Sequence, residues 1–202
     1  MKVSLVMPTI NVTTELELFL KSLKTQTYRD FELIVVDQNE GNEVFEIVKN
    51  YEEEFKIKYA KSDEKGLSLN RNRGLVLMEG GIVGFPDDDC EYQPDTLEKV
   101  VAFFEKKKDY RIYSCRTLER GKTYGTGVME KKDMEIAKNN VDKTVKSITF
   151  FVNYRQDEIV LFDENLGEIN KLSNFTLNLY GLGEESDKAS KVLEEEIEDI
   201  KN

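Results

Sequence analysis

The sequence contains no histidine among its 202 residues. This absence excludes Ser-His-Asp and Cys-His catalysis and every zinc site that depends on a histidine ligand. Acid–base chemistry in this chain must therefore use carboxylates, lysine, tyrosine or cysteine. Cysteine is also scarce, since Cys90 and Cys115 are the only two. Two cysteines this far apart do not make a disulfide framework, and they fit a reducing cytoplasm.

Long hydrophobic runs are missing as well. No apolar stretch approaches the roughly 18–20 residues that cross a bilayer, and the opening MKVSLVMPTI lacks the pattern of a signal peptide. Positive charge is in deficit, because 40 Asp and Glu against 29 Lys and Arg give a formal net charge of −11. That balance argues against a general nucleic-acid binder. With 39% hydrophobic and 34% charged residues, the chain has a globular composition and can bury a sizeable core.

Short apolar segments alternate with amphipathic ones through the first half of the chain. We predict strands over residues 2–7, 31–36, 57–60, 82–85 and 111–115, with helices between them. The helix predicted over 67–78 is weakened by Gly74 in its interior. Strands that alternate with helices imply parallel pairing through right-handed crossovers. We therefore expect an α/β fold, a Rossmann-like open and mainly parallel sheet flanked by helices.

The pattern changes after residue 116. The predicted segments there are strands over 148–153 and 159–162, an irregular stretch over 165–178, and an acidic helix over 184–200. A polar turn joins the two strands, and no low-complexity linker separates the two halves. We expect one domain, in which residues 117–202 form a smaller elaboration that completes the βα half over 1–116.

Polar residues follow three of the predicted strands. Ligands of open parallel sheets bind beyond the carboxyl ends of the strands. The residues at these ends are Pro8, Thr9, Asp37, Asp87, Asp88 and Asp89. Consecutive carboxylates repel one another unless a cation offsets the repulsion, and Mg²⁺ takes one or two carboxylates together with substrate phosphates. The alternatives are a solvated acidic turn for the triplet and a turn-capping role for Asp37.

The predicted helix over 67–78 carries arginines in an acidic protein. Arginine suits phosphate recognition because its planar fork donates two parallel hydrogen bonds, which makes Arg71, beside Asn72, a candidate. A surface salt bridge is the better interpretation of Arg73. Gly66 would let backbone N–H groups approach a phosphate, although glycine before a helix is common.

Two common nucleotide-binding motifs are absent. There is no G-x-G-x-x-G after the first strand and no G-x-x-x-x-G-K-[ST] anywhere. A dinucleotide-binding Rossmann domain and a P-loop ATPase therefore both lose support.

Three segments resemble the family 2 glycosyltransferases of the GT-A fold. They are SLVMPTINVTTELELFLKSLKTQTYRDFELIVVDQNEGN, GLSLNRNRG and GFPDDDCEYQPDTL, in order from Lys2 to about Lys107. A weaker match continues in FDENLG and GLGEESD, which resemble later acceptor-side elements of bacterial members. The resemblance implies transfer of a sugar from a nucleotide-diphosphate sugar to a hydroxyl acceptor, usually with inversion and with a divalent metal, Mn²⁺ or Mg²⁺.

The resemblance places the nucleotide at the first strand ends. Pro8 and Thr9 would line the nucleotide pocket. Asp37 would accept hydrogen bonds from the base or the ribose, and Arg71 would lie near the base or the diphosphate.

The resemblance places the metal at the acidic triplet. Asp87 and Asp89 occupy the two positions of the D-x-D motif, so Asp87 would face the ribose or the metal. Asp89 would bind the metal that bridges the diphosphate. The further donor-binding candidates are Gly66, Asn72 and Asp88.

The GEESD segment matches the place of the family's catalytic base. Glu185 aligns best with that base, and Asp187 is the next candidate. A carboxylate there would take the proton of the attacking hydroxyl, a contribution of roughly 10²–10⁴-fold. Acidic residues at a helix start are also ordinary capping residues.

Two other classes of function stay open. One is a catalytically inactive nucleotide-binding module of a larger assembly. The other is a nucleotidyltransferase, which would normally show a glycine-rich loop and a lysine after the first strand. The resemblance implies a nucleotide-diphosphate sugar donor, a glycan or lipid-linked hydroxyl acceptor and no nucleic acid. Bacterial polysaccharide assembly in the cytoplasm, at the inner face of the cell membrane, is the usual setting. Peripheral membrane association, a homodimer and a trimmed C-terminus are compatible with it.

Overall fold

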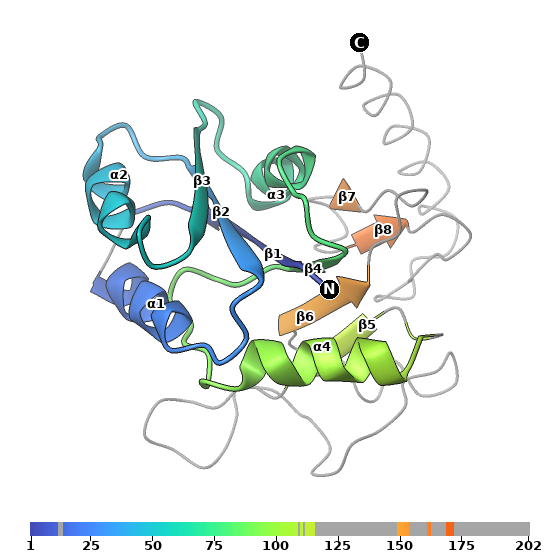
Figure 1. Ribbon diagram of the computed structural model, residues 1–202. Helices are drawn as coiled ribbons and strands as arrows, with labels where there is room; N and C mark the ends of the chain where they lie inside the picture. The colour runs from blue at the N-terminus through green and yellow to red at the C-terminus, as the bar shows by residue number, and fades with distance from the viewer. Residues whose placement is uncertain are drawn as a thin grey trace. The chain divides into compact units, whose positions relative to one another are not determined.

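The structure is a computed structural model that describes residues 1–11, 14–108, 110, 112–115, 149–153, 161–162 and 169–171 (Figure 1). The chain divides into two compact units, Met1–Tyr113 with Phe150–Gln156 and Ser114–Thr149 with Asp157–Asn202. The elements in chain order are β1 (Val3–Thr9), α1 (Thr14–Lys24), β2 (Phe31–Asp37), α2 (Glu43–Val48), the 3₁₀ helix η1 (Lys49–Tyr51), β3 (Lys56–Lys61), α3 (Leu67–Val76), β4 (Ile82–Gly84), α4 (Thr96–Lys106), β5 (Ile112–Cys115), β6 (Thr149–Asn153), β7 (Leu161–Phe162) and β8 (Ile169–Lys171).

Six strands form one sheet in the order β3-β2-β1-β4-β6-β5. β1 lies between β2 and β4 and runs parallel to both, and β2 pairs in parallel with β3. β6 joins beside β4 in the antiparallel direction. The expected α/β fold, with a Rossmann-like and mainly parallel sheet flanked by helices, is confirmed.

The central strands β1 and β2 are buried along their whole length. Figure 1 shows the cause, because α3 covers one face of the sheet while α1 and α4 lie against the other. Strands that are covered on both faces consist of nearly continuous apolar residues, which is why their positions were predictable. The largest fully buried side chains are Phe19, Phe104, Phe151, Leu5, Met7, Leu16, Leu20, Leu23, Leu33, Ile34, Ile82 and Leu97.

Gly74 allows α3 to approach the sheet closely. A Cβ atom at this position would lie 2.3 Å from Cγ1 of Val6 in β1. Glycine costs a helix interior about 1 kcal/mol relative to alanine. The close contact between α3 and β1 explains why a helix forms there despite the glycine.

Short strands in the second half confirm some predictions and correct others. β6 confirms the strand predicted over 148–153, and β7 lies within the one predicted over 159–162. These two strands belong to different sheets, since β7 pairs with β8. β8 falls inside residues 165–178, so the expectation of an irregular stretch is wrong there; three residues are too few to show a period. The helix predicted over 184–200 lies outside the described residues, and the division at residue 116 stays a prediction.

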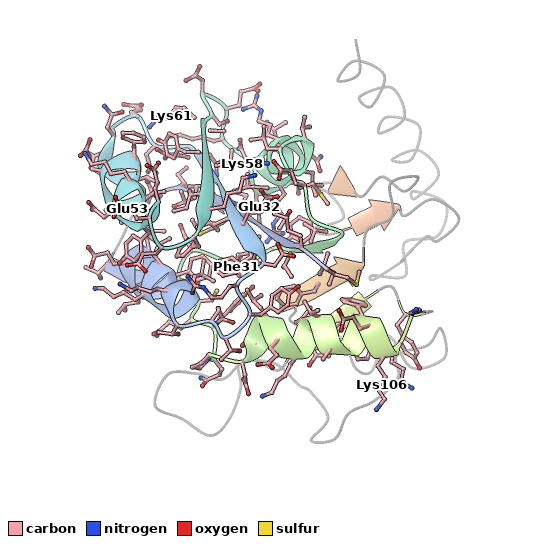
Figure 2. The ribbon with its side chains drawn as sticks, viewed as in Figure 1. Phe31, Glu32, Glu53, Lys58, Lys61 and Lys106 are labelled. Atoms are coloured by element: carbon pink, nitrogen blue, oxygen red, sulfur yellow. The ribbon has the colours of Figure 1, made fainter. Side chains whose placement is uncertain are left out.

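A buried carboxylate on β2 stabilises the amino end of the sheet. Glu32 Oε1 accepts hydrogen bonds at 2.7 Å from the Ser4 hydroxyl and from the Glu79 backbone N–H. The ammonium groups of Lys58 and Lys2 lie 3.2 and 3.3 Å from Oε2, and Figure 2 shows Glu32 beside Lys58 on neighbouring strands. Burial alone would raise the pKa of Glu32, but these partners outweigh burial and hold the pKa below its ordinary value.

Candidate active site

The strand order creates a switch point between β1 and β4. From β1 the chain adds β2 and then β3 on one side, and it returns through α3 to place β4 on the other side of β1. Ligands of open α/β sheets bind outside the carboxyl ends of the strands at such a point. The candidate site therefore lies at the end of β1 and in the turn after β4.

A hydrogen bond joins the two sides of the switch point. Thr9 Oγ1, at the end of β1, donates to Asp88 Oδ2 at 2.5 Å, and Thr9 is almost fully buried. Pro8 lies beyond Leu5, the last residue of β1 that pairs with β4. The N–H that proline lacks therefore removes no hydrogen bond to β4. The structure thus brings together the candidates from two separate strand ends.

The acidic turn faces an arginine of α3. Arg71 Nη2 lies 3.4 Å from Asp87 Oδ1, and its guanidinium lies 5.9 Å from the centre of the Phe85 ring. The Arg71 side chain is only 10% exposed, whereas that of Asp87 is 66% exposed. α3 therefore holds a fixed positive charge at the end of β4, with a carboxylate presented to solvent beside it.

The pKa values of Asp87 and Asp88 in the turn are both raised, mainly by desolvation. Desolvation by the surrounding protein raises the pKa of Asp87, Arg71 opposes the rise, and the neighbouring carboxylates add to it. Desolvation likewise raises the pKa of Asp88, where the Thr9 hydroxyl opposes the rise and Asp89 adds to it. Because solvent still reaches most of Asp87, water screens these charges and their effect on folding stability is small. A cation bound at the turn would lower both pKa values.

The donor atoms of the turn suit a hard divalent cation. Carboxylate oxygens are the ligands that Mg²⁺ and Mn²⁺ prefer, and Asp87 and Asp89 are both exposed. Among the residues that the structure describes, no group of three His, Cys, Asp or Glu side chains is arranged to hold a metal ion. The two exposed carboxylates fit an ion that takes one or two protein carboxylates and completes its coordination with phosphate and water.

Asp37, at the end of β2, is held by four protein donors. Its Oδ1 accepts from the Asn39 backbone N–H at 2.9 Å and from the Asn39 side-chain amide at 2.7 Å. Its Oδ2 accepts from the Tyr59 hydroxyl at 2.5 Å and from Lys61 Nζ at 2.9 Å. Burial would raise the pKa of Asp37, but the hydrogen bonds from Tyr59, Lys61 and Asn39 outweigh burial and lower it. The carboxylate is therefore a buried, ionised group.

The strand register explains how Lys61 reaches Asp37. Thr9 lies opposite Asp37 in the pairing of β1 with β2, and Asp37 lies opposite Lys61 in the pairing of β2 with β3. Sequence reasoning missed Lys61 and Tyr59. The strand predicted over 57–60 ends one residue before β3 does, so Lys61 falls outside it. The rule that selected Asp37 would have selected Lys61 had it been applied to this strand.

The start of α3 is fixed by side chains near the site. Gly66 has φ 150°, which favours glycine. Its N–H donates to Gln38 Oε1 at 2.8 Å, so this particular group is already engaged by the protein. Asn72 is half-buried on α3. Arg73 pairs with Glu64 and Ser62, as the salt-bridge interpretation expects.

Two candidates for the catalytic base lie in the second half of the chain, and a cysteine follows the acidic turn. Glu185 and Asp187 lie outside the described residues, so their role as base stays a prediction. Cys90 follows the acidic turn, where burial and then the charges of Asp87 and Asp89 raise the pKa of its thiol. A thiol kept protonated in this way is a poor nucleophile.

An open α/β sheet with an acidic turn and a buried arginine at its switch point is a fold that binds ligands at this edge of the sheet. The family model described as "Glycosyl transferase family 2" matches residues 4–163. The chain belongs to glycosyl transferase family 2. The expected family and the expectation of a glycosyltransferase are thereby confirmed at the level of the family.

Individual relatives agree with the family. A "GalNAc(5)-diNAcBac-PP-undecaprenol beta-1,3-glucosyltransferase" of Campylobacter jejuni is 29% identical over 161 residues, covering 77% of this chain and 52% of that protein. The "Minor teichoic acid biosynthesis protein GgaB" of Bacillus subtilis is 28% identical over 207 residues, covering 95% of this chain and 23% of that protein. The crystal structure of S. aureus TarS 1-349 in complex with UDP matches with a TM-score of 0.68 and 24% identity, covering 83% of this chain and 52% of that chain. This likeness confirms the GT-A-type fold. The chain spans about half, or less, of the length of these proteins.

Proposed function

We propose that this chain transfers a sugar from a nucleotide-diphosphate sugar to a hydroxyl acceptor in the assembly of a bacterial glycan. The proposal rests on two contacts that connect β1, the turn after β4 and α3 at the switch point. They are the hydrogen bond from Thr9 to Asp88 and the ion pair between Arg71 and Asp87. Family membership and the relatives named above support the same activity.

We propose a uridine or guanosine diphosphate sugar as the donor. TarS has been solved with UDP and with UDP-GlcNAc, and a mannosyltransferase from Pyrobaculum calidifontis with GDP-Man and Mn²⁺. Pro8, Thr9, Asp37, Gly66, Asn72 and Asp88 would surround the nucleotide. Arg71 would lie near its base or its diphosphate, where a fixed guanidinium stabilises negative charge.

We propose that Asp87 and Asp89 hold Mn²⁺ or Mg²⁺ together with the donor diphosphate. The ion would supply positive charge to the leaving diphosphate. Asp88 is already engaged by Thr9, so the outer two residues of the triplet are the better ligands. Arg71 adds a second positive charge that requires no rearrangement when the reaction occurs.

The proposed reaction is one displacement. The acceptor oxygen bonds to the anomeric carbon as the bond from that carbon to the diphosphate oxygen breaks. The acceptor proton passes to a carboxylate, either Glu185 or Asp187, and the nucleoside diphosphate leaves. Attack from the face opposite the diphosphate inverts the anomeric centre.

The acceptor is proposed as a glycan or a lipid-linked hydroxyl, by analogy with the undecaprenol-linked substrate in the name of the C. jejuni relative. No helix within the described ranges is both long enough and apolar enough to cross a membrane.

Thermal unfolding with a nucleotide panel tests the proposal. UDP, GDP, dTDP and CMP are each added with and without Mn²⁺. A ligand at 100 times its dissociation constant adds about 2.7 kcal/mol of stability, which shifts the melting temperature measurably. We expect a shift with UDP or GDP that needs Mn²⁺. No shift with any of the four would contradict the proposed donor site, whereas a shift without sugar transfer in a donor-turnover assay would favour the inactive nucleotide-binding module.

A further inference from the structure

The Asp37 carboxylate has no acceptor position left for a ligand. A carboxylate offers about four lone-pair sites, and four protein hydrogen bonds from Asn39, Tyr59 and Lys61 fill them. The Asp37 side chain is 0% exposed. A nucleobase can therefore bind this carboxylate only if one of the four donors leaves.

Three of the four donors are fixed by the fold. Two come from Asn39, whose Oδ1 also accepts the backbone N–H of Asn11 at 2.7 Å. The third is the hydroxyl of Tyr59, whose ring packs edge-on against Phe45 at a centroid distance of 5.2 Å. Displacing any of these would disturb a second contact inside the protein.

Lys61 is the donor that can leave. It is the last residue of β3, its side chain is 34% exposed, and its ammonium also contacts the Gly41 carbonyl. Figure 2 shows Lys61 near α2, on the same strand as Lys58. A lysine ammonium is strongly hydrated and sits on a flexible stem. Release into water therefore costs little beyond the loss of a partly exposed ion pair.

We propose that Lys61 is a removable cap on Asp37, and that a nucleobase carrying a ring N–H replaces the Lys61 ammonium on Asp37 Oδ2. This inference rests on the proposed function. Uracil N3–H and guanine N1–H are donors that can fill the vacated position. Cytosine has an unprotonated acceptor at N3 in place of this ring donor, and in the same pose it would leave a buried carboxylate partly unpaired. Whether Lys61 leaves Asp37 therefore depends on which base is bound.

Removal of the cap should tighten binding of the correct nucleotide. The affinity of a site that must first open is reduced by the fraction of molecules that are open. Opening the cap breaks the Lys61–Asp37 ion pair, which is exposed on the lysine side only, so deleting Lys61 should raise affinity by at least about fivefold. The gain should apply to UDP or GDP and not to CDP.

Calorimetric titration of the full chain with UDP, GDP and CDP, all with Mn²⁺, tests the cap. Lys61→Met keeps the stem and removes the charge, whereas Lys61→Arg keeps a cation that can cap Asp37. Lys56→Met is the matched control, because Lys56 is on the same strand and pairs with Glu79 rather than with Asp37. We expect Lys61→Met alone to bind UDP or GDP more tightly, with CDP unchanged.

The outcomes separate the two proposals. If the wild type binds UDP or GDP but Lys61→Met binds it equally or more weakly, the cap is wrong and the proposed function stands. If Lys61→Met also binds CDP more tightly than the wild type does, the effect of Lys61 on affinity does not depend on the identity of the base. If the wild type binds no nucleotide, both proposals fail. Should Lys61→Met not fold, Lys61→Leu replaces it, and equal or weaker binding of UDP or GDP by that variant would overturn the cap.

Discussion

Thr9 on β1 and Asp88 after β4 are 79 residues apart in sequence, yet the Thr9 hydroxyl donates to the Asp88 carboxylate at 2.5 Å. The bond ties together the two strands between which the sheet reverses its order. It also opposes the rise in the Asp88 pKa that desolvation causes. The contact therefore serves the fold and the electrostatics of the acidic turn together.

Replacing that hydroxyl should change the titration of Asp88. In Thr9→Val the carboxylate loses its donor, so the pKa of Asp88 should rise further and the free energy of unfolding should fall by about 1 kcal/mol. Carbon-13 NMR of the aspartate carboxyls against pH measures the shift. Thr9→Ser keeps the hydroxyl and should leave the pKa of Asp88 in place; equal pKa values in the two variants would contradict this role.

The acidic turn and the GEESD segment should separate binding from transfer. Asp89→Ala should abolish the Mn²⁺-dependent part of nucleotide binding, whereas Glu185→Gln should bind nucleotide normally and lose transfer by roughly 10²-fold or more. Calorimetry and a donor-turnover assay measure the two effects. Asp30→Ala, an exposed aspartate before β2, is the control. Undiminished metal dependence in Asp89→Ala would show that the metal ligands lie elsewhere.

Filling the space at Gly74 should destabilise the protein. In Gly74→Ala the new methyl group meets Val6 Cγ1 at 2.3 Å, and overpacking of this kind costs about 1–3 kcal/mol. Urea unfolding measures the change. Adding Val6→Ala should recover part of the loss, because residues in contact are not additive. A Gly74→Ala protein as stable as the wild type would show that α3 can move away from β1.

Glu32 should make stability depend on acid pH. Its pKa is lowered in the folded state, so its contribution is complete above the ordinary value of 4.5 and is lost as the pH falls through the folded pKa. At pH 7, Glu32→Gln should be less stable than the wild type by about 2 kcal/mol. That difference should begin to shrink below pH 4.5, where the unfolded chain takes up the proton first, and it should disappear once the pH is below the folded pKa of Glu32.

Urea midpoints from pH 7 to pH 3 measure this difference. Glu53→Gln is the control, since Glu53 is exposed and surface substitutions usually change stability by less than 0.5 kcal/mol. A difference between wild type and Glu32→Gln that does not vary with pH would contradict the prediction.

The sequence predicted the parts of the site that depend on strand ends. β1 and β2 are apolar runs bounded by polar residues, so Thr9 and Asp37 could be placed at one edge before their partners were known. Glu32 could not be found in this way. Its carboxylate lies inside an apolar run, and only the neighbouring strands reveal the lysines around it.

Contacts between strands were the least predictable feature. Tyr59 and Lys61 look like ordinary residues of a weak strand, and their role depends on the register of β3 against β2. β8 could not be predicted from the sequence either, because its three residues are too few to show an alternating pattern. Sequence patterns report burial within one segment, whereas these features arise from pairing between segments.

The site forms only when three strands pair in the correct register. Thr9, Asp37 and Lys61 lie opposite one another across β1, β2 and β3. A slip of one residue in any strand turns its side chains to the opposite face, which would separate Asp37 from its partners. A mispaired chain would therefore lack the site altogether rather than hold a weakened form of it. Insertions within these strands should be excluded for the same reason.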